Sequence, residues 1–431
     1  MPPLCVQYLP DDVPPLRPWM QILDRPCIVE RIFLYLTAGD IVRMGRTCSA
    51  GRLAVQIFRN DHFSINRHLS RFFRHPLAFR SLQAATGTLI SGSSALQFLN
   101  RTFYAKSDLD LYTHPGYAKQ VGRWLIDVEA YQYLPKSSAD IQSFENVACV
   151  EWSPSYHASA DPSMTHNDDD EEEYYYSGLH DVYFFQKTNA TGERLRIQIM
   201  SAQNTPLQCI LRFHSSTSCR DPFILALTIE GGPLACVMNF ITFNAAYSLY
   251  PKATFDHTLN LALRNDCYND QRCLAKYAHR GWRTIGNFWP QDNTTAQLFA
   301  LDQDRFVGDS ICWTILLDLE GVQNRPRLSS TSDAFDWDPA ERNSWSLATT
   351  SAYPWRASTT FSFAKSPVFR FTYLCANEPL RFALTSFGRK QGVLQWKRVK
   401  RRKLKLGSRT DWTWYDSLVP DIIAGFPPHN A

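Results

Sequence analysis

The sequence lacks a strong charge bias, a long apolar run and any pair of cysteines at Cys-x-x-Cys spacing. Its 431 residues include 45 Lys and Arg and 41 Asp and Glu, and the charged fraction of 20% is too low for a disordered acidic or basic chain. A net charge of +4 gives no argument for nucleic acid on its own. The most apolar region, 234–250, is interrupted by polar side chains and offers no span of about 20 apolar residues. The composition therefore excludes a collagen, a coiled coil and a supercharged nucleic-acid binder, and it predicts no membrane segment.

The cysteines and the N-terminal residues bear on the compartment. Eleven cysteines, an odd number, are spread from Cys5 to Cys375. The first 18 residues are rich in proline and have neither a basic start nor an apolar run, so they predict no secretory signal and read as a flexible tail. We therefore expect reduced thiols, mostly small core residues, in a protein of the nucleus, the cytoplasm or both.

Two local charge blocks depart from the balanced composition. Residues 168–173 are three aspartates followed by three glutamates, inside a segment, 154–178, that is predicted to be a solvated insertion. Residues 397–405 contain seven basic side chains. This run resembles a nuclear import signal, whose basic residues would be Lys397, Arg398, Lys400, Arg401, Arg402 and Lys403. The alternatives are a contact with nucleic-acid phosphates, which is the weaker interpretation, and a solvated strand edge.

Residues 19–62 are predicted to form three short helices. An apolar stripe at helical spacing is formed by Ile28, Val29, Ile32, Phe33 and Leu36. Pro26 fits the first turn of this helix, and the break after Leu36 supplies a cap for the next one. So small a bundle cannot bury all its apolar side chains, so the exposed remainder would suit a partner protein.

The same segment resembles a divergent F-box. The residues that carry the resemblance are Leu23, Pro26, Ile28, Ile32, Leu36, Asp40, Ile41 and Cys48. The resemblance implies a module that docks on the Skp-type adaptor of a cullin ubiquitin ligase, joined to a downstream domain that captures a substrate. It implies that the adaptor is contacted by Leu23, Pro26, Ile28, Ile32 and Leu36. A generic three-helix cap is the alternative.

The length allows two or three domains of about 150 residues, and residues 63–285 predict a domain of strands and helices. Residues 61–85 interleave arginine and aromatic side chains, which favours an amphipathic helix packed on the next domain over a nucleic-acid contact. Predicted strands lie at 87–90, 107–112, 182–186, 195–200 and 237–243, and predicted helices at 95–99, 116–128 and 259–282. Residues 286–431 are predicted to be an irregular or β-rich C-terminal region that carries the basic run.

Two short motifs carry candidate chemistry. Asp108 and Asp110 lie two apart on a predicted strand, so their carboxylates project from the same face. Two hard oxygen ligands side by side are what magnesium needs to bridge the phosphates of a nucleotide. Gly92, Ser93 and Ser94 lie between a strand and a helix, where backbone N–H groups and a small hydroxyl can hold phosphate oxygens.

These residues resemble the motif of the polymerase-beta-like nucleotidyltransferase superfamily. The segment Gly87–Tyr112, together with Asn239–Thr254, resembles fungal proteins that carry this fold, and the resemblance extends over roughly residues 80–285. The motif is a Gly-Ser turn that opens a helix, then an Asp-x-Asp strand, then a third acid on a later strand. The resemblance implies that Asp108 and Asp110 are the catalytic, magnesium-binding residues. It also implies that the turn formed by Gly92, Ser93 and Ser94 binds a nucleoside triphosphate.

The third acid of the motif is missing. Its position falls at Arg196 or Gln198, and neither residue can act as a base or add a negative charge to a metal site. Asp181 and Glu193 are candidate substitutes, but alternation along a strand does not by itself place either on the correct face.

The predicted fold class is α+β, with a small F-box-like helical bundle and a nucleotidyltransferase-like mixed sheet flanked by helices. Two functions follow. The first is a protein-interaction or recognition protein, an F-box-like adaptor whose nucleotidyltransferase-like domain is degenerate and uses no cofactor in catalysis. The second is an active nucleotidyltransferase that uses magnesium and a nucleoside triphosphate to modify a hydroxyl acceptor. A carboxylate within ligand reach of both aspartates would favour the enzyme.

Overall fold

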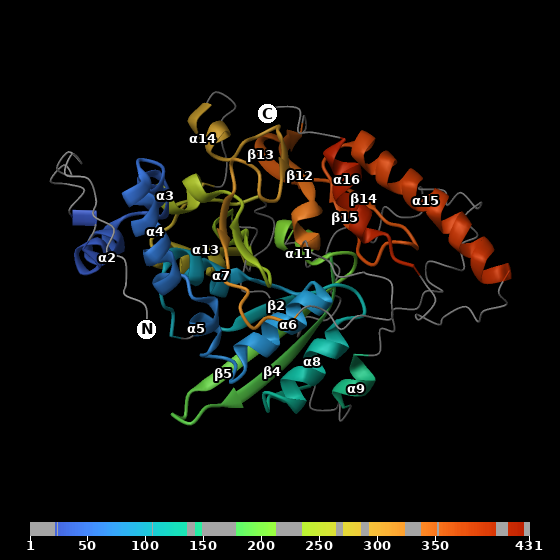
Figure 1. The fold of residues 1–431 in the computed structure, drawn as a ribbon, viewed down its shortest axis with the longest axis horizontal. Coiled ribbons are helices and arrows are strands. Elements are labelled where there is room, and N and C mark those ends of the chain that lie inside the picture. The colour runs from blue at the N-terminus through green and yellow to red at the C-terminus, as the bar shows by residue number, and fades with distance from the viewer. Residues whose placement is uncertain are drawn as a thin grey trace, which may run out of the picture. The chain divides into compact units, whose positions relative to one another are not determined.

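A computed structural model describes residues 22–23, 25–105, 107–135, 143–148, 178–212, 235–263, 270–285, 293–323, 338–350, 353–401 and 413–425. The chain divides into two compact units, Met1–Ser64 (unit 1) and Ile65–Ala431 (unit 2). The predicted tail 1–18, the acidic block and residues 402–405 of the basic run lie outside the described residues. The described elements are α+β with a mixed sheet, as predicted (Figure 1).

Between residues 25 and 64, unit 1 contains three short helices, α2 (Pro26–Tyr35), α3 (Ala38–Gly45) and α4 (Ser49–His62). Pro26 occupies the first turn of α2, where its missing N–H costs no hydrogen bond. A capping box begins α3: the backbone N–H of Asp40 donates to Thr37 Oγ1 at 3.2 Å, and that of Thr37 donates to the Asp40 carboxylate. The three predicted helices are therefore confirmed.

The buried side of α2 is narrower than the predicted stripe. Val29 and Phe33 are buried, and the Phe33 ring meets that of Phe58 on α4 edge to face at 5.3 Å. Ile32 is 40% exposed and Tyr35 is 91% exposed. Packing against α4 buries one row of the stripe, and part of its remaining apolar surface is exposed, in agreement with the prediction that so small a bundle leaves apolar side chains exposed.

Unit 2 is built on an eight-stranded mixed sheet with the order β11-β7-β6-β1-β2-β5-β4-β3. Its strands are β1 (Leu89–Ser91), β2 (Leu109–Thr113), β3 (Gln132–Leu134), β4 (Leu179–Thr188), β5 (Arg194–Ala202), β6 (Asn239–Ile241), β7 (Ala245–Ser248) and β11 (Trp313–Leu316). Strands β2 and β5 run parallel, whereas the other neighbours in this sheet run antiparallel. The predicted hairpin is confirmed as β4 and β5, joined by a turn at Gly192.

Helices flank this sheet in Figure 1: α5 (Ile65–Leu69), α6 (Pro76–Thr86), α7 (Gly92–Asn100), α8 (Ala118–Asp127), α9 (Phe144–Val147), α11 (Pro206–Arg212) and α13 (Asp270–His279). The arginine-aromatic stretch packs through α6, as predicted. Phe73 and Phe79 are buried and stacked at 4.3 Å. Arg80 is also buried, and its Nη2 donates to the backbone oxygens of Phe243 and Asp318. These side chains stabilise the fold and offer no surface to nucleic acid.

The prediction of one helix over 259–282 is wrong. A strand, β8 (Leu259–Leu261), precedes α13 and pairs in parallel with β9 (Arg283–Ile285). Asn260 explains the strand, because its buried side chain accepts from the Cys236 N–H and donates to Thr284 Oγ1, both at 3.2 Å. These partners lie outside 259–282, so local periodicity does not show them.

The C-terminal region is β-rich in part. It contains a three-stranded sheet of β10 (Asp304–Phe306), β12 (Ser344–Thr350) and β13 (Tyr353–Thr360), and a pair formed by β14 (Ser362–Ala364) and β15 (Tyr373–Cys375). Its described residues also form the α-helices α14 (Asn293–Leu298), α15 (Glu378–Arg401) and α16 (Val419–Ala424).

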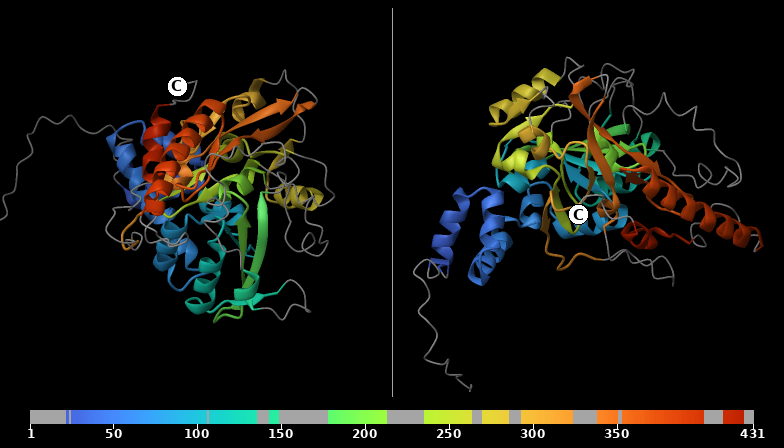
Figure 2. Two further views of the ribbon diagram at one scale, coloured as in Figure 1. Left: turned by 90° about the vertical axis from the view of Figure 1, so that its right-hand side faces the viewer. Right: turned by 90° about the horizontal axis from the view of Figure 1, so that it is seen from above.

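The 24-residue helix α15 was not predicted, and its length is visible in Figure 1 and in the right-hand view of Figure 2. Leu380 and Leu384, four residues apart, are buried against the end of the sheet pair β14–β15. The basic run begins within this helix, so the interpretation of residues 397–401 as a strand edge is wrong. Basic side chains near the carboxyl end of a helix are stabilising, because they interact with the partial negative charge of the helix dipole at that end.

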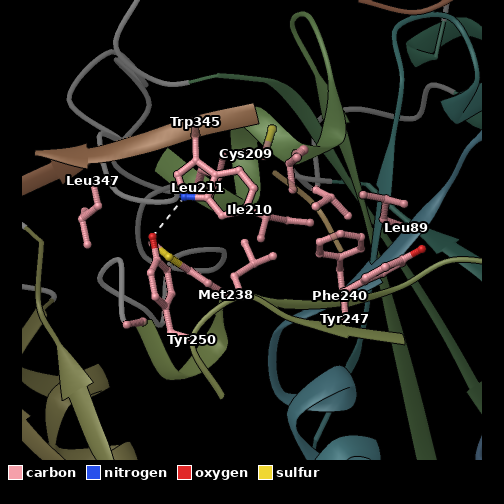
Figure 3. Close-up of a cluster of buried hydrophobic side chains, with 14 of the residues drawn as sticks. Leu89, Cys209, Ile210, Leu211, Met238, Phe240, Tyr247, Tyr250, Trp345 and Leu347 are labelled. Atoms are coloured by element: carbon pink, nitrogen blue, oxygen red, sulfur yellow. Dashed lines mark hydrogen bonds between the residues drawn. The ribbon is translucent and has the colours of Figure 1, made fainter. Parts of the chain in front are cut away.

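The main core joins the C-terminal strands to the eight-stranded sheet (Figure 3). Trp345 of β12 is fully buried, and its Nε1–H donates to the Tyr250 hydroxyl at 3.0 Å. The same cluster includes Leu89 of β1 and Phe240 of β6. The region after residue 286 therefore shares its hydrophobic core with the sheet that carries the candidate site.

Candidate functional site

The Gly-Ser turn and the Asp-x-Asp strand meet at one end of the β1–β2 pair. Ser91, the last residue of β1, lies opposite Asp110 of β2. Gly92 follows with φ +65°, and a Cβ placed on it would lie 2.3 Å from Asp110 Oδ2. Only glycine tolerates both this conformation and this approach. The two predicted motifs therefore come together around Asp110.

The strand that the resemblance requires for a third acid is β5, which lies beside β2. Asp110 is paired with Gln198 in the parallel register. Gln198 Nε2 also donates to Asp108 Oδ2 at 3.3 Å. Of the two positions considered, Gln198 is the one that contacts the aspartates, while the Arg196 side chain is exposed. An amide therefore lies where the motif would place an acid.

The two substitute carboxylates lie elsewhere. Asp181 of β4 is opposite Ser201, three residues along β5 from Gln198. Since successive side chains alternate between the faces of a sheet, Asp181 belongs to the opposite face from Gln198. Glu193 lies in the hairpin turn, where its carboxylate accepts from Arg71 Nη2 at 2.8 Å. Neither residue replaces the missing acid.

The two serines after Gly92 have different surroundings. Ser93 Oγ accepts from Arg280 Nη1 at 3.1 Å and lies 3.3 Å from the Tyr277 hydroxyl, so that α7 and the end of α13 lie side by side (Figure 1). Ser94 is buried, and its Oγ is hydrogen-bonded to His68 Nε2 at 2.9 Å. Burial, with the nearby charge of Arg71, lowers the pKa of His68 to about 4, so this imidazole is neutral at physiological pH. Both serines are buried, and Ser94 contacts α5 through His68 whereas Ser93 contacts Arg280 and Tyr277.

The loop that precedes Asp108 is fixed from two sides. Gln97 of α7 accepts from the Tyr104 N–H at 2.7 Å and donates to Ser107 Oγ at 2.9 Å. Arg71 donates to the Tyr104 carbonyl at 3.2 Å. These bonds hold the backbone that leads into β2 and thereby set the position of Asp108.

Sequence reasoning missed Arg280, Tyr104 and Tyr277. Arg280 lies 187 positions from the serine that it contacts, and its guanidinium carbon lies 3.9 Å from the centre of the Tyr104 ring. An isolated arginine after a helix carries no local signal. Only the fold brings it to the Gly-Ser turn.

No protein-family model matches this chain, and no curated protein or solved structure does so either. The two family resemblances therefore stay predictions that depend on the quoted residues.

The donor set around Asp110 suits one magnesium ion that is shared with phosphates, because magnesium is commonly held by one or two carboxylates plus phosphate oxygens. Asp108 and Asp110 would supply the carboxylates. In the described part of the chain, no group of three or more His, Cys, Asp and Glu side chains is placed to hold a metal ion.

The remaining predicted residues belong to unit 1 and to the basic run. In unit 1, Pro26 and Ile32 are exposed, and Leu23, Ile28 and Leu36 are half-buried. In α15 the side chains of Lys397 and Arg398 are exposed, Lys400 and Arg401 continue the helix, and Arg402 and Lys403 lie outside the described residues. Across the described ranges, no helix has both the length and the apolar character needed to cross a membrane.

Proposed function

We propose that this chain is a recognition protein, in which unit 2 binds a magnesium-nucleotide without transferring it and unit 1 acts as an F-box-like adaptor. The observation that carries the first part is the Gln198 amide, which is hydrogen-bonded to Asp108 and paired with Asp110. Gly92, Asp108 and Asp110 supply what a nucleotide and a magnesium ion need for binding.

With an amide at Gln198, the site keeps the groups needed to bind a magnesium-nucleotide but lacks a group needed to transfer the nucleotidyl moiety. A metal shared with phosphates needs hard oxygen ligands, which the two aspartates provide. Transfer to a hydroxyl also needs a group that removes the proton of that hydroxyl or fixes a second metal. An amide does not take up a proton at neutral pH and contributes no charge. An active magnesium-dependent nucleotidyltransferase is therefore the second candidate, and it requires an acid from outside this set.

The first prediction concerns binding and label transfer. The full chain, incubated with magnesium and each of the four α-labelled nucleoside triphosphates, is expected to bind at least one of them and to form no labelled product. Asp110→Ala is expected to weaken binding about 10- to 100-fold, because it removes a charged ligand. Equilibrium dialysis measures the binding, and gel separation detects covalent label.

Two variants control this experiment. Asp181→Ala removes a carboxylate from the opposite face of the sheet and should leave the affinity unchanged. Gln198→Glu restores an acid beside Asp108, so transfer seen only in this variant would identify the amide as the cause of inactivity. Label transfer by the wild type that is lost in Asp108→Ala would contradict the proposal and favour the enzyme.

The second prediction concerns the adaptor surface. Ile32→Asp is expected to weaken binding to a purified Skp-type adaptor about tenfold or more, because a charge replaces an exposed apolar contact. Circular dichroism should be unchanged, since Ile32 lies outside the packed row of Val29 and Phe33. Biolayer interferometry with the full chain measures the affinity.

Gln56→Asp is the matched control, because it adds the same charge at an exposed polar position of α4. Its affinity should equal that of the wild type. Absence of binding by the wild type, or equal loss in both variants, would remove the adaptor role while leaving the proposal for unit 2 intact.

A further inference from the structure

Arg280 is held in a defined position by the turn that ends α13. Its backbone N–H and that of Trp282 both donate to the Tyr277 carbonyl, at 3.1 and 3.0 Å. Between them, Gly281 adopts φ +99°, which permits the tight reversal. The Trp282 ring is buried, and its Nε1–H donates to the Thr254 carbonyl at 3.0 Å. The arginine therefore extends from an anchored turn.

The guanidinium group of Arg280 has polar and aromatic neighbours. Its Nη1 donates to Ser93 Oγ at 3.1 Å, and its carbon lies 3.9 Å from the Tyr104 ring centre and 5.3 Å from that of Tyr277. Within the described residues these contacts are a hydroxyl and two aromatic rings, and none is a carboxylate. Arg280 is half-buried, and because no carboxylate is among these contacts of the described residues, its guanidinium retains the capacity to bind an anion.

Arg280 is connected to Asp110 through two adjacent residues, Ser93 and Gly92. Ser93 follows Gly92 directly, and Gly92 is the residue that lies against the Asp110 carboxylate. The Arg280 guanidinium and the Asp110 carboxylate thus contact adjacent residues of one turn. This turn opens α7, a helix of nine residues whose first amides favour an anion. A polyphosphate bound at this turn would lie near a cation and near the Asp110 carboxylate, which could share a metal ion with it.

We propose that Arg280 is the phosphate-binding cation of this site and that its ligand is the polyphosphate chain of a nucleoside triphosphate. This inference rests on the proposed function of unit 2 and names the residue that recognises the charged part of the ligand. A guanidinium has five N–H donors, so Arg280 can keep its bond to Ser93 while it donates to a phosphate oxygen. Tyr104 stacks on the guanidinium and holds it in the required plane.

The test uses the full chain and two probes, inorganic tripolyphosphate without metal and ATP with magnesium. Arg280→Ala is expected to weaken tripolyphosphate binding about 10- to 100-fold, as for loss of a charge-assisted hydrogen bond. Arg280→Lys should recover part of that loss, because it restores the charge without the planar fork. Arg283→Ala, which removes an exposed arginine of β9, should bind as the wild type does. Isothermal titration calorimetry at two salt concentrations measures each affinity.

A structural role for Arg280 would give a different pattern. In that case Arg280→Ala would lower the melting temperature, and lysine would not restore binding. The salt dependence of tripolyphosphate affinity should also be weaker in Arg280→Ala than in the wild type, since one charge no longer takes part.

The experiments distinguish the role of Arg280 from the proposed magnesium-nucleotide site of unit 2. Equal tripolyphosphate affinity of wild type and Arg280→Ala, or no binding by either, would overturn the role of Arg280. Tripolyphosphate binding that depends on Arg280, with no effect of magnesium or of Asp110→Ala on ATP, would support the cation and refute the magnesium-nucleotide site. Loss of ATP binding in both Arg280→Ala and Asp110→Ala supports both.

Discussion

Gly92→Ala is expected to weaken magnesium-nucleotide binding about 10- to 100-fold and to destabilise unit 2 by about 1–2 kcal/mol. The new Cβ would lie 2.3 Å from Asp110 Oδ2, so the carboxylate must turn away from its present position. The stability cost has a separate origin, because alanine at φ +65° is strained. Equilibrium dialysis measures the first effect, and urea unfolding measures the second.

Gly192→Ala is the matched control for this variant. Gly192 has φ +80° in the β4–β5 turn, and a Cβ there would meet no atom within 4 Å. It should cost a similar free energy of unfolding and leave nucleotide affinity unchanged. If Gly92→Ala bound nucleotide as tightly as Gly192→Ala, the carboxylate beside the turn could not be a ligand.

Trp345→Ala is expected to lower the free energy of unfolding of unit 2 by about 3–5 kcal/mol, the largest stability effect that we predict. The side chain is fully buried, and its removal leaves a cavity and takes away the hydrogen bond to the Tyr250 hydroxyl. Because Trp345 packs in one cluster with residues of β1 and β6, the loss should be felt across the sheet. Urea unfolding followed by circular dichroism measures it.

Leu316→Ala provides the comparison, since Leu316 of β11 is 68% exposed and should change stability by no more than about 0.5 kcal/mol. If the C-terminal strands were an independent layer, Trp345→Ala would produce an additional early transition and leave the main transition of the sheet unchanged. One shifted transition for unit 2 is the expected result.

Local signals predicted the part of the site that local sequence controls. A glycine before a helix, two aspartates separated by one residue, and a hairpin turn each act within a few positions, so their elements were found. The order and pattern of the motif also limited the third position to Arg196 or Gln198. The pairing then distinguishes the two, because Gln198 lies opposite Asp110.

The features that were not predicted from the sequence depend on contacts between segments that are distant in the chain. The strand at Asn260 exists because Cys236 and Thr284 satisfy its side chain. The buried row of α2 is selected by Phe58, and Arg280 reaches Ser93 from 187 positions away. Periodicity describes one segment at a time, so it cannot anticipate which neighbour a segment will meet.

The parallel alignment of β2 with β5 does not depend on the length of the connection between β3 and β4. The hairpin with β4 sets the register of β5, and the acidic block lies in the sequence between β3 and β4. Lengthening a connection costs closure entropy that rises only slowly with its length. That stretch can therefore gain, lose or exchange residues over evolutionary time while Asp110 and Gln198 keep their alignment.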